Sequence, residues 1–405
     1  MNRNSPTRLG GVLLAALIAS GCSSSSSAGP TSISPTPHVV LSTPSILSPP
    51  SVPAGPSRTF VSEVAFATRR LGWAAGLHCG DPGANGRCAI LGSSTADGGK
   101  TWSAAVPVGQ PEYSEDSSPR IHIRFSGLHG WVFGPGIYGT HDGGRTWRLQ
   151  DQRPTLSLES AGSSVWAVTG CIRSQPCAPH LIESSAGSDR WNDAPTQPPA
   201  SASNDAVLER AGATTTFLAA MNGSKTFSES TQLLVTRNSG ADWTELAAPC
   251  QDLRQLRSLD GTLVWALCAS QPGAGSQPKA VYVSLDGGRA WELRAQTSYP
   301  DAVGSLSIGG YAMTFVVTSA STGLIGSQRG GVSLSNDQGR NWSAPAADVV
   351  GGDAGLGVRQ LWFVDPSHGW ALGGYGSSGP ALWATSDGGH HWAPSGNPLQ
   401  TSEVS

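Results

Sequence analysis

Ser284-Leu-Asp286-Gly-Gly288-Arg-Ala-Trp291 is one copy of a pattern, Ser/Thr-x-Asp-x-Gly-x-x-Trp, that recurs along the chain. Four further intact copies end at Trp102, Trp147, Trp342 and Trp392. A sixth copy, Thr236–Trp243, carries an asparagine in place of the aspartate, and a seventh, Ser184–Trp191, keeps only the serine and the tryptophan. The tryptophans that end the copies are 45, 44, 52, 48, 51 and 50 residues apart. They are Trp102, Trp147, Trp191, Trp243, Trp291, Trp342 and Trp392.

This spacing is about the length of one four-stranded propeller blade. A second motif runs in phase with the first: a β-patterned run, a turn, and then Gly-Trp, as at Phe66…Gly72-Trp73 and Phe125…Gly130-Trp131. Together the two motifs predict an all-β fold, a seven-bladed β-propeller with four-stranded antiparallel blades over residues 59–397.

The chemistry of the first motif is that of a tight turn. An Asp or Asn side chain accepts hydrogen bonds from backbone N–H groups, Gly supplies a positive φ, and Trp packs beneath the turn or between blades. A metal-binding or catalytic role for these carboxylates is less favoured, because five clean copies in register fit a repeated turn. The residues predicted to be structural are Asp97, Trp102, Asp142, Trp147, Asn238, Trp243, Asp286, Trp291, Asp337, Trp342, Asp387 and Trp392.

These repeats resemble the Asp-box, or bacterial neuraminidase, repeat. The added Phe-x₅₋₆-Gly-Trp-Ala pattern is similar to the photosystem II assembly and stability factor family and its relatives in non-photosynthetic bacteria. The resemblance covers roughly residues 58–397 and implies a seven-bladed propeller. A role in photosynthesis does not follow, because the same repeat occurs in proteins of many functions.

The sialidase branch of Asp-box proteins has an Arg-Ile-Pro motif near the first blade. The only Arg-Ile here is Arg120-Ile121, which is followed by His122 and lies in the second blade. A glycoside hydrolase would also need two carboxylates about 5 to 10 Å apart. The sequence therefore favours a non-enzymatic protein-interaction or assembly scaffold, with a glycan-binding protein or Asp-box-type glycoside hydrolase as the alternative.

The N-terminus has the pattern of an export signal. Arg3 and Arg8 precede an apolar run, Leu9–Ala19, that is too short to span a bilayer, and Cys22 follows Ser-Gly. This resembles a bacterial lipobox, although Ala19 stands where Leu is usual. An ordinary signal peptide with an incidental cysteine is the alternative.

The predicted organisation is a signal peptide (1–21), a lipidated Cys22 with a disordered Ser/Pro/Thr-rich linker (22–58), the propeller, and a disordered tail (398–405). The expected location is extracytoplasmic, anchored by lipid to the outer leaflet of the cell membrane, with the outer membrane as an alternative. A net charge of −3 without a basic stripe argues against nucleic acid. No cofactor is expected, and the partner is an unidentified protein or glycan.

The other six cysteines form three local pairs, Cys79/Cys88, Cys171/Cys177 and Cys250/Cys268. An exported compartment permits disulfides, and the spacings match no common zinc pattern, so disulfides are predicted and no metal site. In a blade of four strands, all three pairs map to the end opposite the Asp-containing turns. Loops stapled on a rigid scaffold are typical of binding surfaces, although the staples could equally serve only stability.

One predicted strand carries cations on one side. In residues 120–125, Arg120, His122 and Arg124 alternate with Ile121, Ile123 and Phe125. Arg254, Arg257 and Arg359 occupy comparable first strands, so the six cationic residues are candidates for one basic binding face. Separate ion pairs between blades are the other interpretation.

Overall fold

The computed structural model describes residues 58–80, 88–110, 120–170, 177–223, 229–297, 302–344, 357–373 and 381–399. The chain divides into two units, Met1–Ser51 and Val52–Ser405, and every described residue belongs to the second unit. Cys22 and Cys171 therefore lie outside the described residues. The described part contains no helix with the length and apolarity that crossing a bilayer requires.

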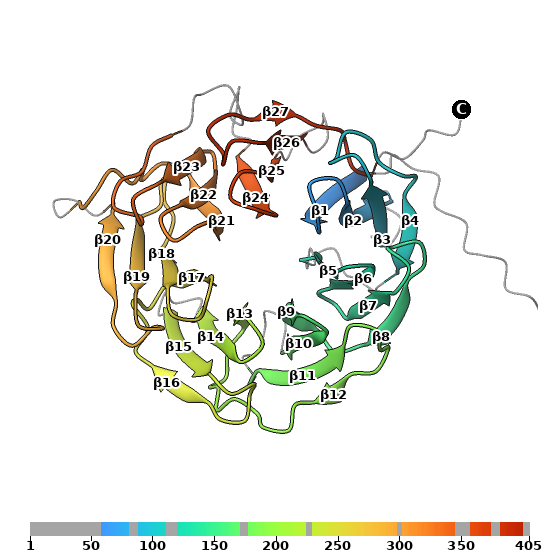
Figure 1. The fold of residues 1–405 in the computed structure, drawn as a ribbon, viewed down its shortest axis with the longest axis horizontal. Helices are drawn as coiled ribbons and strands as arrows, with labels where there is room; N and C mark the ends of the chain where they lie inside the picture. The colour runs from blue at the N-terminus through green and yellow to red at the C-terminus, as the bar shows by residue number, and fades with distance from the viewer. Residues whose placement is uncertain are drawn as a thin grey trace, which may run out of the picture. The chain divides into compact units, whose positions relative to one another are not determined.

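The predicted fold is confirmed: seven antiparallel sheets follow one another around a ring (Figure 1). Blades 1 to 4 consist of β1 (Arg58–Phe66), β2 (Gly72–Cys79), β3 (Cys88–Thr95) and β4 (Val106–Gly109); β5 (His122–Ser126), β6 (His129–Phe133), β7 (Ile137–Thr140) and β8 (Arg148–Asp151); β9 (Thr155–Ala161), β10 (Ser164–Thr169), β11 (His180–Ser185) and β12 (Asn192–Asp193); and β13 (Asp205–Ala211), β14 (Thr215–Gly223), β15 (Glu229–Thr236) and β16 (Thr244–Leu246).

Blades 5 to 7 consist of β17 (Leu253–Ser258), β18 (Val264–Ala269), β19 (Lys279–Ser284) and β20 (Glu292–Gln296); β21 (Tyr311–Val317), β22 (Gly323–Gln328) and β23 (Gly331–Ser335); and β24 (Val358–Phe363), β25 (Gly369–Gly373), β26 (Ala381–Thr385) and β27 (Ala393–Pro394). Among the described residues, blade 6 has three strands, and a single bridge between Leu334 and Ser343 stands where the fourth would be.

Strand position explains the sequence patterns. The first strand of each blade is innermost and the last is outermost (Figure 1). The second strand is covered on both faces by neighbouring blades, so it is apolar throughout rather than alternating. In β18, VWALCA, all six residues are buried, and in β2 the first six are buried.

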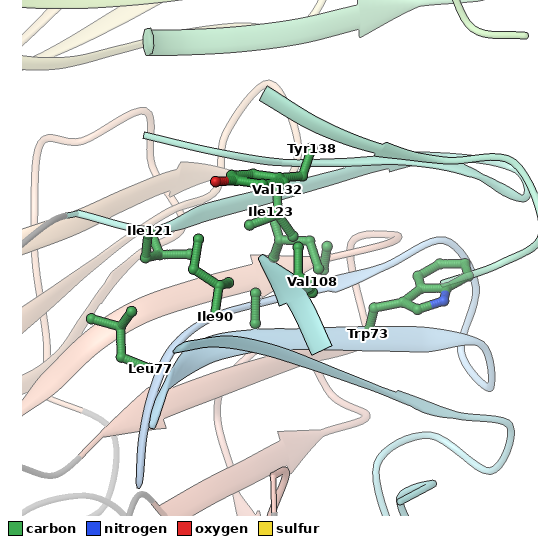
Figure 2. Packing of buried hydrophobic residues seen from close by; sticks show 10 residues of the cluster. Trp73, Leu77, Ile90, Val108, Ile121, Ile123, Val132 and Tyr138 are labelled. Carbon is green, nitrogen blue, oxygen red and sulfur yellow. The ribbon is translucent and has the colours of Figure 1, made fainter. Parts of the chain in front are cut away.

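The hydrophobic core is divided among the junctions between blades. Seven clusters of buried residues each combine side chains from two adjacent blades. Figure 2 shows the cluster between blades 1 and 2, where Leu77 and Ile90 of blade 1 face Ile121 and Ile123 of blade 2. Each blade is therefore stabilised chiefly by its two neighbours.

Packing also closes the ring. In the described part of the chain, blade 1 is built only from N-terminal strands and blade 7 only from C-terminal ones, so the two ends share no strand. Instead, the Gln360 side chain bonds both backbone groups of Val64, at 2.8 and 3.0 Å. Leu399, which is buried, extends the cluster between these two blades.

The ring has two distinct ends. One end carries the turns between the first and second strands and between the third and fourth strands, and we call it the turn face. The opposite end, with the connections between second and third strands and the crossovers between blades, is the loop face. In every blade one backbone N–H of the third-to-fourth turn donates to a carbonyl of the first-to-second turn. The donors are Gly98, Gly143, Ala186, Ser239, Gly287, Gln338 and Gly388.

Candidate functional site

The first strand of each blade has no strand neighbour on the side nearer the axis of the ring. The backbone N–H groups on that edge therefore need other acceptors. A polar side chain of the preceding blade supplies one at six junctions. Ile123 N–H donates to Glu63, Ser258 N–H to Glu209, and Val64 N–H to Gln360. In the same way, the backbone N–H groups of Leu208, Phe315 and Leu361 donate to the side chains of Ser157, Gln255 and Thr314, respectively.

Bulges in the inner strands aim several of these acceptors. The register shifts between Val61 and Glu63 in β1 and between Val358 and Gln360 in β24. A bulge turns the following side chain away from the regular alternation, and here that side chain reaches the next blade. The same shift precedes Gln255 and Thr314.

Glu63 forms the centre of the largest charged group on the inner strands. Its carboxylate lies 2.7 Å from His122 Nδ1 and 3.0 Å from Arg124 Nη1. Burial alone would raise the pKa of Glu63, but the charges of His122 and Arg124 and the attached hydrogen bonds lower that pKa to about 2. Arg124 also pairs with Glu159 at 3.0 Å and lies over the Trp362 ring, 5.5 Å from its centroid. This group joins blades 1, 2, 3 and 7.

Glu209 and Arg257 form a second group. Their charged atoms are 3.3 Å apart, and Arg257 also donates to the Phe315 carbonyl at 3.0 Å. Burial raises the pKa of Glu209 to about 7, against the opposing effect of Arg257, and the charge of Glu159 raises it further. Glu209 therefore titrates near neutral pH, and Glu159 is close enough for its negative charge to contribute to the raised pKa.

The remaining cationic residues of the predicted basic face have separate partners. Arg120 lies 3.4 Å from Asp205, Arg254 donates to the Ala269 carbonyl at 3.0 Å, and Arg359 donates to the Val61 carbonyl. For Arg124 and Arg257, the observed contacts are ion pairs between blades. Ligand binding by any of the six stays a prediction.

The Asp-containing turns share one set of hydrogen bonds. In blade 2 the Asp142 carboxylate accepts from Thr140 Oγ1 at 2.8 Å, from the backbone N–H groups of Arg145 and Thr146 at 2.9 and 3.0 Å, and from Thr146 Oγ1 at 2.7 Å. Gly143 and Gly144 have φ of 75° and 86°, which L side chains rarely adopt. These bonds lower the pKa of Asp142 to about 2, although burial opposes them.

At two junctions the Gly-Trp motif joins one blade to the next. Trp73 stacks on Phe125 of blade 2 at 3.6 Å, and its indole N–H donates to the Gly143 carbonyl at 2.7 Å. Trp370 makes the same pair of contacts with blade 1. A Cβ at Gly130 would lie 2.3 Å from the Phe125 ring, which is why glycine precedes the tryptophan.

Two turns depart from the repeat in ways the sequence did not reveal. Trp291 donates to Ala247 O of the preceding blade, whereas Trp342 donates to Gly339 O of its own turn. Among the described residues, the indole nitrogen of Trp243 has no partner. In this turn the Asn238 side-chain carbonyl accepts from Asp242 N–H at 3.0 Å, whereas Ala241 N–H donates to the backbone carbonyl of Asn238.

Two predicted disulfides are confirmed, Cys79–Cys88 and Cys250–Cys268, with Cα separations of 4.1 and 6.3 Å. Both lie at the loop face, the first between β2 and β3 and the second between the crossover into blade 5 and β18. Asp252 lies within 4.8 Å of the second pair, but the two sulfurs are joined to each other rather than free as thiolates. Cys177 is also disulfide-bonded, and its predicted partner Cys171 is outside the described residues.

Sequence reasoning missed the acidic partners Glu63, Glu159 and Glu209, all on inner strands. The available signal was weak, because each of these first strands mixes several polar residues with apolar ones. Their partners lie on other blades, between 35 and 61 residues away along the chain, so no local pattern identifies them.

The fold defines a seven-bladed propeller of the four-stranded antiparallel class. The sequence matches no protein-family model and no curated protein. Solved structures with a similar fold include YCF48 bound to D1 peptide, which is 17% identical with a TM-score of 0.53, over 82% of this chain and 94% of that one.

YCF48 from Cyanidioschyzon merolae is 16% identical with a TM-score of 0.54, over 82% of this chain and 96% of that one. A PL25 ulvan lyase bound to -[GlcA(1-4)Rha3S]- is 9% identical with a TM-score of 0.51, over 85% and 96%. At these identities the likeness establishes the fold alone.

Proposed function

We propose that this protein is an exported, lipid-anchored Asp-box propeller that binds a protein partner at its loop face and acts as a non-enzymatic assembly scaffold. The observation that carries the proposal is the position of the two described disulfides. Cys79–Cys88 in blade 1 and Cys250–Cys268 at the entry to blade 5 stiffen the same end of the ring. Stiffened loops lose less conformational freedom when a partner binds them.

The inner-strand contacts support a scaffold over an enzyme. Glu63 and Glu159 are engaged with Arg124, and Glu209 with Arg257, so the buried carboxylates described above hold blades together. Among the similar structures, the complex of YCF48 with D1 peptide is a propeller with a bound peptide. That likeness supports a polypeptide as the ligand class.

Cross-linking in a matched pair of positions tests the binding face. Blade 5 offers Gln271, exposed in the loop between β18 and β19, and Leu285, which is 58% exposed in the turn between β19 and β20. A photo-reactive residue at Gln271 should capture a discrete protein from solubilised membranes of the producing cells. The same residue at Leu285 should not. Capture mainly from Leu285 would overturn the assignment of the loop face.

Anchoring is tested separately at Cys22. The Cys22→Ala variant should lose incorporation of labelled palmitate and should leave the detergent phase, or remain an unprocessed precursor. Palmitate incorporation that persists in this variant would contradict the lipid anchor without touching the proposed binding face.

A glycan-active protein is the second candidate, and one observation favours it. Glu209, with a pKa of about 7, could donate a proton, and Glu159 lies near enough to influence that pKa. The fold likeness to a propeller lyase bound to a uronate-containing oligosaccharide points the same way. Turnover of uronate polysaccharides or aryl glycosides that is abolished by Glu209→Gln would establish this candidate over the scaffold.

A further inference from the structure

Two imidazoles meet at the turn face, at the junction of blades 2 and 3. His129 begins β6, and His141 lies in the turn between β7 and β8. Their Nδ1 atoms are 2.9 Å apart, and the ring planes are inclined by 67°. On its other side, His141 Nε2 lies 2.9 Å from Oδ1 of Asp189, which belongs to blade 3.

The carboxylate behind His141 is held in place from within the junction. Gln150 Nε2 donates to Asp189 Oδ1 at 2.7 Å, and Gln150 Oε1 accepts from Trp191 Nε1 at 3.1 Å. Arg148 lies 3.9 Å from the other carboxylate oxygen. As a carboxylate, Asp189 offers only acceptor oxygens to Gln150 and His141.

This arrangement fixes the tautomer of neutral His141. Because Asp189 can only accept, Nε2 of His141 must carry the hydrogen, and Nδ1 then presents a lone pair toward His129. A carboxylate behind one nitrogen with a lone pair on the other is the usual setting of a metal-binding histidine. His141 is one-third exposed, which leaves an approach for an ion from solvent.

The distance between the nitrogens suits two adjacent ligands of one ion. With metal–nitrogen bonds of about 2.0 to 2.1 Å at a right angle, the two nitrogens would be about 2.9 Å apart. Right-angled nitrogen pairs occur in square-planar and tetragonal sites, which indicate Cu²⁺ or Ni²⁺, and Cu²⁺ binds tightest in the divalent series.

The residues involved depart from the repeat. At the position of His141, the intact turns of blades 1, 5 and 6 carry Ala96, Leu285 and Asn336. At the position of Asp189, five other blades carry a basic residue and blade 4 carries Ala241; the basic residues are Lys100, Arg145, Arg289, Arg340 and His390. Neither identity is required by the turn, yet the two side chains meet.

We propose that His129 and His141 bind one divalent transition-metal ion, preferentially Cu²⁺, through their Nδ1 atoms, with Asp189 orienting His141 and water completing the coordination. The site lies on the turn face and is independent of the partner binding proposed for the loop face. Without the ion, neutral His129 donates its Nδ1 hydrogen to His141, so binding requires this hydrogen to be transferred through water to Nε2 of His129.

Titration of the purified, untagged protein with Cu²⁺ tests the proposal. The wild type should bind one equivalent, and His129→Asn and His141→Asn should each weaken binding at this site at least 10-fold. Asp189→Asn should weaken it about 10- to 100-fold, the usual effect of removing such a carboxylate. His368→Asn is the matched control, because His368 is also two residues before a Gly-Trp tryptophan and bonds Asp365 within its own turn.

Paramagnetic resonance of the wild-type Cu²⁺ complex gives a readout that does not depend on the folding of any variant. Two coupled nitrogens are expected. A spectrum with fewer nitrogens, or an affinity unchanged in both His129→Asn and His141→Asn, would overturn the site and leave the pair as an ordinary N–H···N hydrogen bond. A loss in His368→Asn as large as in His141→Asn would overturn it equally.

Discussion

Two buried tryptophans at equivalent positions differ in the hydrogen bond of the indole N–H group. This difference gives the sharpest test of how neighbouring blades are held together. Trp73 and Trp131 both follow a glycine of a second strand, and both are at most 1% exposed. Trp73 Nε1 donates to the Gly143 carbonyl at 2.7 Å. Among the described residues, Trp131 Nε1 has no acceptor.

Replacing each tryptophan by phenylalanine removes the same volume, so the cavity contribution is similar in the two variants and largely cancels in their difference. Trp73 also stacks on Phe125, and a phenylalanine at position 73 keeps an aromatic ring for this contact. Trp73→Phe also loses a hydrogen bond with a net value of about 0.5 to 1.5 kcal/mol. Trp131→Phe removes an unpaired buried donor, which recovers about 1 to 3 kcal/mol. We therefore expect Trp73→Phe to be less stable than Trp131→Phe by about 1.5 to 4.5 kcal/mol.

Differential scanning calorimetry is the appropriate assay, because fluorescence would change with the tryptophan itself. For a domain of roughly 340 residues, each kcal/mol shifts Tm by about 1 to 2 °C. The two variants should thus differ in Tm by roughly 2 to 9 °C, with matching far-UV circular dichroism at 20 °C as the check on folding. Equal loss of Tm in both would refute the role given to the indole hydrogen bond.

The remaining predictions concern the Asp-containing turns, the Cys79–Cys88 disulfide and the buried carboxyl group of Glu209. Asp142→Ala should lower the free energy of unfolding by about 1 to 3 kcal/mol in urea, because four hydrogen bonds to the carboxylate are lost; a change below measurement error would contradict that. The double variant Cys79→Ser, Cys88→Ser should lose about 2 to 3 kcal/mol, and reduction of the wild type should reproduce part of that loss. The pKa of Glu209 is raised from 4.5 to about 7 in the folded protein, so the native state holds this proton more tightly and the contribution of Glu209 to stability falls as pH rises from 4.5 through 7. Denaturation of Glu209→Gln across this window should show a less negative slope than the wild type, and an unchanged slope would contradict the raised pKa.

The blade count follows from sequence because the signals are local. Asp142 bonds residues only two to four positions away, and Gly143 and Gly144 adopt their positive φ within the same turn. A local motif of this kind can be recognised without knowing what lies beside it. Cys79 and Cys88 are similarly predictable, because a hairpin places them opposite each other.

The charged contacts between blades depend on register that sequence patterns do not carry. Glu63 reaches Arg124, 61 residues away, only because a bulge in β1 redirects its side chain. Gln360 meets Val64 across 296 residues only because the ring closes. The cationic side chains of Arg124 and Arg257 were visible in the sequence, but their carboxylate partners were identifiable only from the assembled blades.

In blade 3, a repeat residue is missing from the same turn that makes a new contact with blade 2. Ala186 stands where other turns have Asp or Asn, so this turn has no carboxylate to organise its own backbone, and Trp131 of blade 2 has no acceptor beside it. The nearby carboxylate, Asp189, is three residues further on and is held by Gln150 while it bonds His141. The Asp189 carboxylate accepts from Gln150 and His141, both of blade 2, and so serves the junction between the blades. His141 occupies a variable position of an intact turn and Asp189 lies in the degenerate turn, so neither is a residue that the motif requires, and positions of this kind can acquire chemistry without the loss of a motif residue.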